Sequence, residues 1–296
     1  MKILVIGSKG QLGCELVRLG NEAGAEIIGL DLPEIDITDR SQVKEALASS
    51  RPEALINAAA FTDVEKAEGL SETAFLINSV GPAILAEECA NTETPLIHIS
   101  TDFIFDGRKT SPYVESDATG PLSVYGASKL DGEKKIMAIP GKHLILRTSW
   151  LYGVYGNNFV KTMLRLAHTK KSMSVVADQH GSPTSAADLA SALLLICEKV
   201  TRGADIEWGT YHYCGRGEAS WAMFATQIYE TAKKIGLLSE TPEVIPISTH
   251  EYPTAAERPA FSVLDCGKIQ KNFGIAPLLW QESLENMLKR LSHEKT

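Results

Sequence analysis

The sequence predicts an α/β fold, a doubly wound parallel sheet with a smaller α/β lobe interleaved with it. Short apolar runs alternate with helix-period patterns through the first half of the chain, and most runs end at small or polar residues. Parallel strands are buried on both faces, which explains why these runs are continuously apolar. The 296 residues suffice for about two cores. We expect a first domain over 1–150 and a lobe mainly over 151–296, with segments after 171 returning to the first domain.

The composition is typical of a globular protein, because 44% of the residues are hydrophobic. The 29 basic and 37 acidic residues give a net charge of −8, which argues against a nucleic-acid or membrane partner. The five cysteines form no Cys-x-x-Cys pair, and the seven histidines show no ligand spacing, so we expect free thiols and no metal site. No apolar run is long enough for a signal peptide or a membrane span. We therefore expect a cytoplasmic protein.

A glycine-rich loop follows the first predicted strand, residues 2–6, and opens a helical pattern. Gly7 permits a tight turn, Gly10 lets backbone N–H groups approach a pyrophosphate, and Gly13 lets the helix pack closely on the strand. The spacing is Gly-x-x-Gly-x-x-Gly. A glycine-rich connection without a ligand is the alternative, but the strand–loop–helix context favours a dinucleotide-binding site.

An acidic residue ends the second predicted strand, residues 26–30. Asp31 lies about twenty residues after the glycine loop, where a carboxylate accepts hydrogen bonds from the adenosine ribose. A 2′-phosphate would be repelled there, and Leu32 follows instead of an arginine, so Asp31 favours NADH. The alternative is that Asp31 only caps a turn. Asp36 and Ile37 are predicted to end a short third strand that touches adenine.

Further strands are predicted at 54–57, 95–99, 143–146, 174–177 and 210–214. Helices are predicted around 78–89, 157–164, 186–200, 221–234 and 284–291, with another that opens after a cap at Thr38 or Asp39. Residues 58–60 are alanines, which leave room for a cofactor across the end of a strand. Residues 61–65 are predicted to be a loop.

Tyr125 and Lys129 are the principal catalytic candidates. A helix through this segment places both side chains on one face, about one turn apart. A nearby ammonium lowers the pKa of a phenol, so that Tyr125 can exchange a proton with a carbonyl oxygen as it becomes an alcohol. A surface turn followed by a helix is the alternative. Ser100 and Thr101 supply competing hydroxyls at the end of the strand predicted at 95–99.

Together, these motifs resemble the extended short-chain dehydrogenase/reductase superfamily. Longer blocks are similar to the dTDP-4-dehydrorhamnose reductase family and cover most of the chain. The blocks span 57–68, 100–107, 115–133, 147–153, 156–167, 178–184 and 257–259.

The resemblance implies a reaction, the reduction of dTDP-4-dehydro-6-deoxy-L-mannose to dTDP-L-rhamnose with NADH or NADPH. It implies that Thr101, Tyr125 and Lys129 are catalytic. The cofactor-binding residues implied by the motifs and the resemblance are Gly7, Gly10, Gln11, Leu12, Gly13, Asp31, Leu32, Asp36, Ile37, Ala58, Ala59, Ala60, Thr62, Asn78, Tyr125 and Lys129. The substrate-binding residues are Val64, Thr101, Asp102, Phe103, Trp150, Asn158, Lys161 and Arg258.

Two of these assignments have structural alternatives. Trp150 is expected to form a wall of the sugar pocket, and the alternative is a buried core aromatic. Arg258 is expected to bind the diphosphate through its forked donors, and the alternative is a surface charge.

The chain departs from its relatives at one proposed site. Some members are described with a magnesium-linked dimer that uses three glutamates. Glu15 matches one of them, but the other two positions carry Ala187 and Arg290. We therefore expect no such metal site, and a monomer or a homodimer built in another way. Two other functions remain open: an NAD-dependent nucleotide-sugar epimerase, and a non-catalytic NADP(H)-binding regulatory subunit of the methionine adenosyltransferase type.

Overall fold

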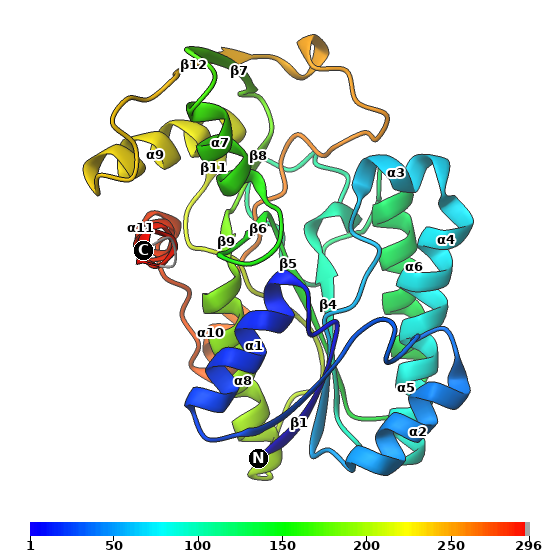
Figure 1. Cartoon of the computed structure of the whole chain (residues 1–296). Helices are drawn as coiled ribbons and strands as arrows, with labels where there is room; N and C mark the ends of the chain where they lie inside the picture. Colours follow the sequence, from blue (N-terminus) through cyan, green and yellow to red (C-terminus); the bar gives the residue numbers. More distant parts are fainter. Residues whose placement is uncertain (294–296) are drawn as a thin grey trace.

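A six-stranded parallel sheet forms the centre of the computed structural model, which describes residues 1–293 (Figure 1). Every neighbouring pair of its strands is parallel. The strand at one edge of the sheet comes from the second half of the chain. In spatial order the strands are β2 (Glu26–Leu30), β1 (Lys2–Ile6), β3 (Ala54–Asn57), β4 (Leu96–Thr101), β5 (His143–Thr148) and β10 (Gly209–His212).

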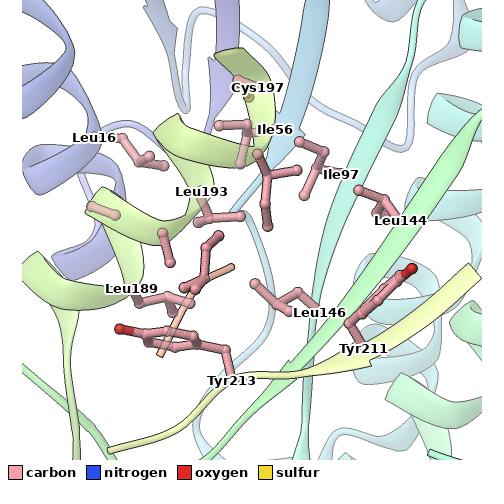
Figure 2. Close-up of a cluster of buried hydrophobic side chains, with 14 of the residues drawn as sticks. Leu16, Ile56, Ile97, Leu144, Leu146, Leu189, Leu193, Cys197, Tyr211 and Tyr213 are labelled. Atoms are coloured by element: carbon pink, nitrogen blue, oxygen red, sulfur yellow. The ribbon is translucent and has the colours of Figure 1, made fainter. Parts of the chain in front are cut away.

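Helices cover both faces of this sheet (Figure 1). Side chains alternate along each strand, so that Ile3 and Val5 pack on one face and Leu4 and Ile6 on the other. Figure 2 shows the hydrophobic core on the face of Ile3 and Val5, where Leu16 and Leu193 contact residues of the strands. That face carries α1 (Gln11–Glu22) and α8 (Ala186–Thr201), and the opposite face carries α2 (Arg40–Ser50), α5 (Gly81–Asn91) and α6 (Val124–Ala138).

Short elements lie near the carboxyl ends of the central strands. After β3 come α3 (Val64–Gly69), α4 (Ser71–Phe75) and a π-helical turn, η1 (Leu76–Val80). A 3-10 turn, η2 (Asp102–Ile104), follows β4 directly. A separate short helix, α10 (Gly267–Phe273), packs along the edge strand β10.

A smaller lobe lies beyond the carboxyl edge of the sheet (Figure 1). Its core includes Phe224, Trp280 and Leu284, all nearly or fully inaccessible to solvent. Its helices are α7 (Phe159–Ala167), α9 (Trp221–Lys234) and α11 (Trp280–His293), and it also contains the short turn η3 (Thr249–Glu251). Three two-stranded sheets complete it: β7 (Ser172–Val176) with β12 (Glu243–Ile247), β6 (Leu151–Tyr152) with β9 (Thr184–Ser185), and β8 (His180–Gly181) with β11 (Ala219–Ser220).

Most predicted helices and strands are confirmed, with ends within about two residues of the expected ones. Two local predictions were wrong. Asp36 and Ile37 lie in a turn and not in a strand. The Asp36 carboxylate accepts hydrogen bonds from the backbone and side chain of Thr38, which closes that turn. The loop expected at 61–65 ends earlier, because Asp63 caps α3 by accepting from the Lys66 N–H.

Candidate functional site

The glycine loop lies at the carboxyl edge of the sheet, where space is too small for side chains. Gly7 has a φ of +83°, and a Cβ atom there would lie 2.5 Å from the backbone nitrogen of Ala59. A Cβ atom on Gly13 would lie 2.1 Å from the Gly7 carbonyl oxygen. The three chain segments can approach this closely only because both residues are glycine.

The amino end of α1 is suited to bind an anion. Gly10, the cap residue, is extended and supplies no side-chain hydrogen bond, and the first turn contains no acidic residue. The first backbone N–H groups of a helix point outward and carry a partial positive charge. A dinucleotide diphosphate fits this loop and helix end, so the site matches the chemistry that the sequence predicts.

Asp31 takes part in a turn, as the structural alternative for this residue predicts. Its carboxylate accepts hydrogen bonds of 2.8 Å from the backbone N–H groups of Lys9 and Leu32. The Lys9 ammonium donates to the Leu32 carbonyl at 3.0 Å and pairs with Glu34. A basic group therefore lies beside Asp31, although the sequence suggested none. Lys9 comes from the glycine loop, so its position beside Asp31 cannot be predicted from the segment that follows Asp31.

The other predicted cofactor residues differ in accessibility. Ala58, Ala59 and Ala60 are half-buried, and Thr62 is exposed. Asn78 is fully buried, and its amide binds both backbone polar groups of Phe61. Leu32 is exposed, Asp36 closes the turn described above, and Ile37 is buried against Gly81. Direct contacts of these residues with a cofactor stay predictions.

The amino end of α6 brings the two principal catalytic candidates to the same edge. Ser123 caps the helix by accepting from the Gly126 N–H at 3.2 Å. A Cβ atom on Gly126 would lie 2.2 Å from the Phe103 carbonyl oxygen, so glycine lets α6 pack tightly on η2. The Tyr125 and Phe103 rings meet edge to face, with centroids 5.8 Å apart. The predicted helix through Tyr125 and Lys129 is confirmed.

The expectation that Lys129 lowers the pKa of Tyr125 is not met in this structure. Burial raises the pKa of Tyr125 to about 12, because the phenolate would lose hydration. A hydrogen bond with Thr101 opposes this change, and the negative charge of Asp102 adds to it. Tyr125 therefore stays protonated at neutral pH. Thr101 is the hydroxyl that acts on the pKa of Tyr125, whereas the competing Ser100 hydroxyl is buried without a partner.

Lys129 is buried to 2% exposure and donates a hydrogen bond of 2.6 Å to the Ile99 carbonyl. Its Nζ atom also lies 3.4 Å from Nε2 of His98. Burial lowers the pKa of Lys129 to about 8, although the negative charge of Glu133 acts in the opposite direction. The amine and the ammonium are thus close in free energy near neutral pH.

Thr101 and Asp102 lie at the end of β4 and the start of η2. The Thr101 hydroxyl donates to Oδ1 of Asp102 at 3.2 Å, whereas Oδ2 has no partner and is buried. Burial raises the pKa of Asp102 to about 7, although the nearby hydroxyls of Ser262 and Thr101 act in the opposite direction. Asp102 is therefore a buried carboxyl group, adjacent in sequence to Thr101, that titrates near neutral pH.

Trp150 packs against a second tryptophan, and its predicted contact with the sugar is untested. Its ring stacks on Trp221 at a centroid distance of 3.6 Å and an interplanar angle of 7°. Trp150 is only half-buried and has a φ of +44°, an unfavourable conformation for a bulky residue. Trp221 was not among the predicted site residues, because its position at the start of an amphipathic helix indicates a core role.

Asn158 and Lys161 have structural roles in α7. Asn158 caps the helix by accepting from the Lys161 N–H, and its amide donates to Gln11 of the glycine loop at 2.8 Å. Lys161 donates to the carbonyls of Val154 and Gly156. Both residues therefore support the loop that joins β6 to α7, and their predicted contacts with substrate are untested.

Arg258 is paired with Glu65, which is not among the site residues that the sequence predicts. The Arg258 Nη2 atom lies 2.6 Å from Oε1 of Glu65, and the Arg258 Nε atom is buried without a partner. The second Glu65 oxygen accepts from the backbone N–H groups of Ala255 and Ala256. Val64 precedes Glu65 and is half-buried. The sequence provides no local signal for this pair.

Arg290, one of the two residues expected to exclude a metal site, forms an ion pair with Glu15. Its guanidinium lies 2.8 Å from Oε1 of Glu15, which is fully buried. Among residues 1–293, no group of three or more metal-ligating side chains could hold a metal ion. No helix in that range is long and apolar enough to cross a membrane.

Comparisons with known proteins agree with this geometry. The model of the RmlD substrate binding domain family matches residues 1–293. The dTDP-4-dehydrorhamnose reductase of Aggregatibacter actinomycetemcomitans is 44% identical over 97% of this chain and 98% of that protein. A solved dTDP-4-dehydrorhamnose reductase of Clostridium acetobutylicum is 37% identical, with a TM-score of 0.91 over 99% of this chain and all of that one.

A structure of the Bacillus anthracis dTDP-4-dehydrorhamnose reductase, in complex with NADP, is 36% identical. It aligns with a TM-score of 0.90 over 98% of this chain and 99% of that one. The agreement extends over the sheet, the glycine loop and the smaller lobe, since nearly every residue is covered. The chain belongs to the dTDP-4-dehydrorhamnose reductase family.

Proposed function

We propose that the protein reduces the 4-keto group of dTDP-4-dehydro-6-deoxy-L-mannose to form dTDP-L-rhamnose. NADH or NADPH is the reductant, and Tyr125 is the proton donor. The relatives named above support the reaction. The observation that carries the proposal is the proximity of the Tyr125 phenol to the Thr101 hydroxyl at the end of β4.

The chemistry follows from the charge that develops on the ketone oxygen. When bound, the dinucleotide supplies the hydride that adds to the ketone carbon. Tyr125 gives its phenolic proton to the oxygen, and Thr101 donates a hydrogen bond to the same atom. The ammonium form of Lys129 returns a proton to the phenolate that remains on Tyr125, and the resulting amine regains a proton from solvent. Burial keeps Tyr125 protonated before the reaction begins.

The remaining residues bind and orient the two reactants. The glycine loop and the amino end of α1 hold the dinucleotide diphosphate, and Asp31 binds the adenosine ribose. Phe103 and Trp150 supply apolar walls for the sugar. Arg258 binds the diphosphate of the substrate.

The proposal is tested by following the near-ultraviolet absorbance of NADH and NADPH. The ketosugar substrate is generated in place by a dehydratase and an epimerase that act before this step. We expect oxidation of at least one dinucleotide only when the ketosugar is present. A folded protein that binds a dinucleotide but oxidises neither would contradict the proposal and favour the regulatory subunit.

A further inference from the structure

Three buried polar side chains form a continuous row beneath the candidate site. Asn57, His98 and Lys129 are exposed by 1%, 0% and 2%. Asn57 and His98 are direct partners in the parallel ladder of β3 and β4, so both side chains lie on the face that α6 covers. Buried polar groups are costly unless each is hydrogen-bonded, which makes the pairing within this row informative.

The orientation of the Asn57 amide is determined by its surroundings. Its Oδ1 atom accepts a hydrogen bond of 3.1 Å from the Ala59 N–H. A flipped amide would place two donors against each other at that contact. The Nδ2 atom must therefore be the group that lies 3.0 Å from Nδ1 of His98, and it donates to that nitrogen.

This contact determines the tautomer of His98. Burial, together with the positive charge of Lys129, places the pKa of His98 well below its usual range, so the ring is neutral. A neutral imidazole carries one hydrogen, and Nδ1 is already an acceptor, so the hydrogen is on Nε2. That Nε2–H group faces the Nζ atom of Lys129 at 3.4 Å. An ammonium cannot donate to it, whereas a neutral amine can accept from it.

A second buried histidine on the same sheet provides the opposite arrangement. His212 is also fully buried, and its Nε2 atom lies 3.4 Å from Nη1 of Arg147. Its Nδ1 atom, however, lies 3.1 Å from the Tyr113 carbonyl oxygen, which can only accept. His212 must therefore carry its hydrogen on Nδ1 and accept from Arg147 through Nε2. The two histidines face buried cations with opposite tautomers.

We propose that Asn57 and His98 are positioning residues for Lys129: the Asn57 amide fixes the His98 tautomer, and the His98 Nε2–H favours the neutral amine. This inference rests on the proposed function in one respect, the catalytic role of Lys129. The charged group that acts on Lys129 is Glu133 on its own helix, which favours the ammonium. Glu133 is itself ion-paired with Arg147 of β5 at 2.7 Å. The Nε2–H group of His98 opposes the stabilisation of the ammonium by Glu133. Lys129 can therefore exchange a proton near neutral pH.

The first test reads the tautomers directly, without substrate or cofactor. Long-range proton–nitrogen NMR correlations of histidine-labelled protein distinguish a hydrogen on Nδ1 from one on Nε2. Signals are assigned with His98→Gln and His212→Gln. We expect the hydrogen on Nε2 in His98 and on Nδ1 in His212. A hydrogen on Nδ1 of His98, or on both of its nitrogens, would overturn the proposal. The result does not depend on reductase activity, so the two proposals can fail separately.

The second test uses an isosteric change. In Asn57→Asp, a carboxylate accepts from the Ala59 N–H and from Nδ1–H of His98, so that Nε2 becomes an acceptor for the ammonium. The pH at which kcat/KM for reduction falls should then rise by about one unit or more. Asn21→Asp adds the same charge at an exposed position and should leave the profile unchanged. A folded Asn57→Asp protein with the wild-type pH profile would show a structural role only. If that variant does not fold, the wild-type NMR result decides.

Discussion

Arg258 and Glu65 form an ion pair of 2.6 Å although they are 193 positions apart in the sequence. The same carboxylate holds the backbone of Ala255 and Ala256, so Glu65 fixes the whole segment that carries Arg258. Both side chains remain partly exposed, and such pairs contribute about 0–1 kcal/mol to stability. The pair therefore matters for the position of Arg258 and not for folding.

Glu65→Ala should weaken binding of the sugar nucleotide. Without Glu65, the segment around Arg258 loses three hydrogen bonds and must be ordered when the diphosphate binds. We expect KM for the sugar nucleotide to rise about tenfold, equivalent to ~1.4 kcal/mol, with kcat within about threefold of wild type. Steady-state kinetics with saturating dinucleotide measure this change. An unchanged KM would show that Arg258 does not bind the diphosphate in the position that Glu65 gives it.

Lys9→Met should change the preference between the two dinucleotides. The Lys9 ammonium lies beside the turn that holds Asp31, close enough to offset the repulsion between that carboxylate and a 2′-phosphate. We expect Kd for NADPH to rise about tenfold, or ~1.4 kcal/mol, while Kd for NADH stays within about twofold. Fluorescence titrations measure both constants, and Lys44→Met, an exposed position on α2, is the control. Equal losses for both dinucleotides would exclude a role in recognising the 2′-phosphate.

Gly13→Ala should disrupt the cofactor loop. The added Cβ atom would lie 2.1 Å from the Gly7 carbonyl oxygen and 2.5 Å from the Cα atom of Ser8, both parts of the backbone. Overpacking of this kind costs about 1–3 kcal/mol of unfolding free energy. Urea unfolding and NADH titration should show lower stability and little binding. Gly69→Ala, where a Cβ atom meets nothing within 4 Å, should retain both properties. Normal NADH affinity in Gly13→Ala would contradict the role given to this loop.

Asp102→Asn should stabilise the protein increasingly as the pH rises. Burial raises the pKa of Asp102 from 3.8 to about 7, so the native state keeps a proton that the unfolded chain releases. Native stability from this group is fully present below about pH 4 and is lost as the pH rises to about 7, by up to ~1.4 kcal/mol per pH unit. Urea unfolding of both proteins between pH 5 and pH 8 measures the difference. A constant difference across that range would show that Asp102 is already ionised in the native protein.

The sheet, its helices and several caps could be predicted because their signals are local. Asp39 and Asn158 each accept from a backbone N–H two or three residues later, which is what their position before an apolar pattern indicates. The strand predicted to end at Ile37 is absent, because Ile37 lies in a turn. It is buried to 5% exposure in a turn, and one buried isoleucine gives the same signal in a turn as at the end of a strand.

The environment of the site could not be predicted, because it depends on contacts between distant segments. The spacing of Tyr125 and Lys129 predicted their helix correctly, but not the burial that raises the pKa of Tyr125. His98 shows no ligand spacing in the sequence, and its contact with Lys129 depends on the packing of α6 over β4. Such relationships require the register of the strands and the position of each helix.

The measurement that tests the central claim most directly is the rate of substrate reduction by Tyr125→Phe, with dinucleotide and ketosugar both saturating. Removal of a proton donor should lower this rate by about 10²- to 10⁴-fold, while the protein folds and binds the dinucleotide as wild type does. Tyr113→Phe is the matched control, since Tyr113 donates to Asp106 and has no assigned role in the reaction. A Tyr125→Phe protein that retains the wild-type rate would contradict the assignment of Tyr125 as proton donor.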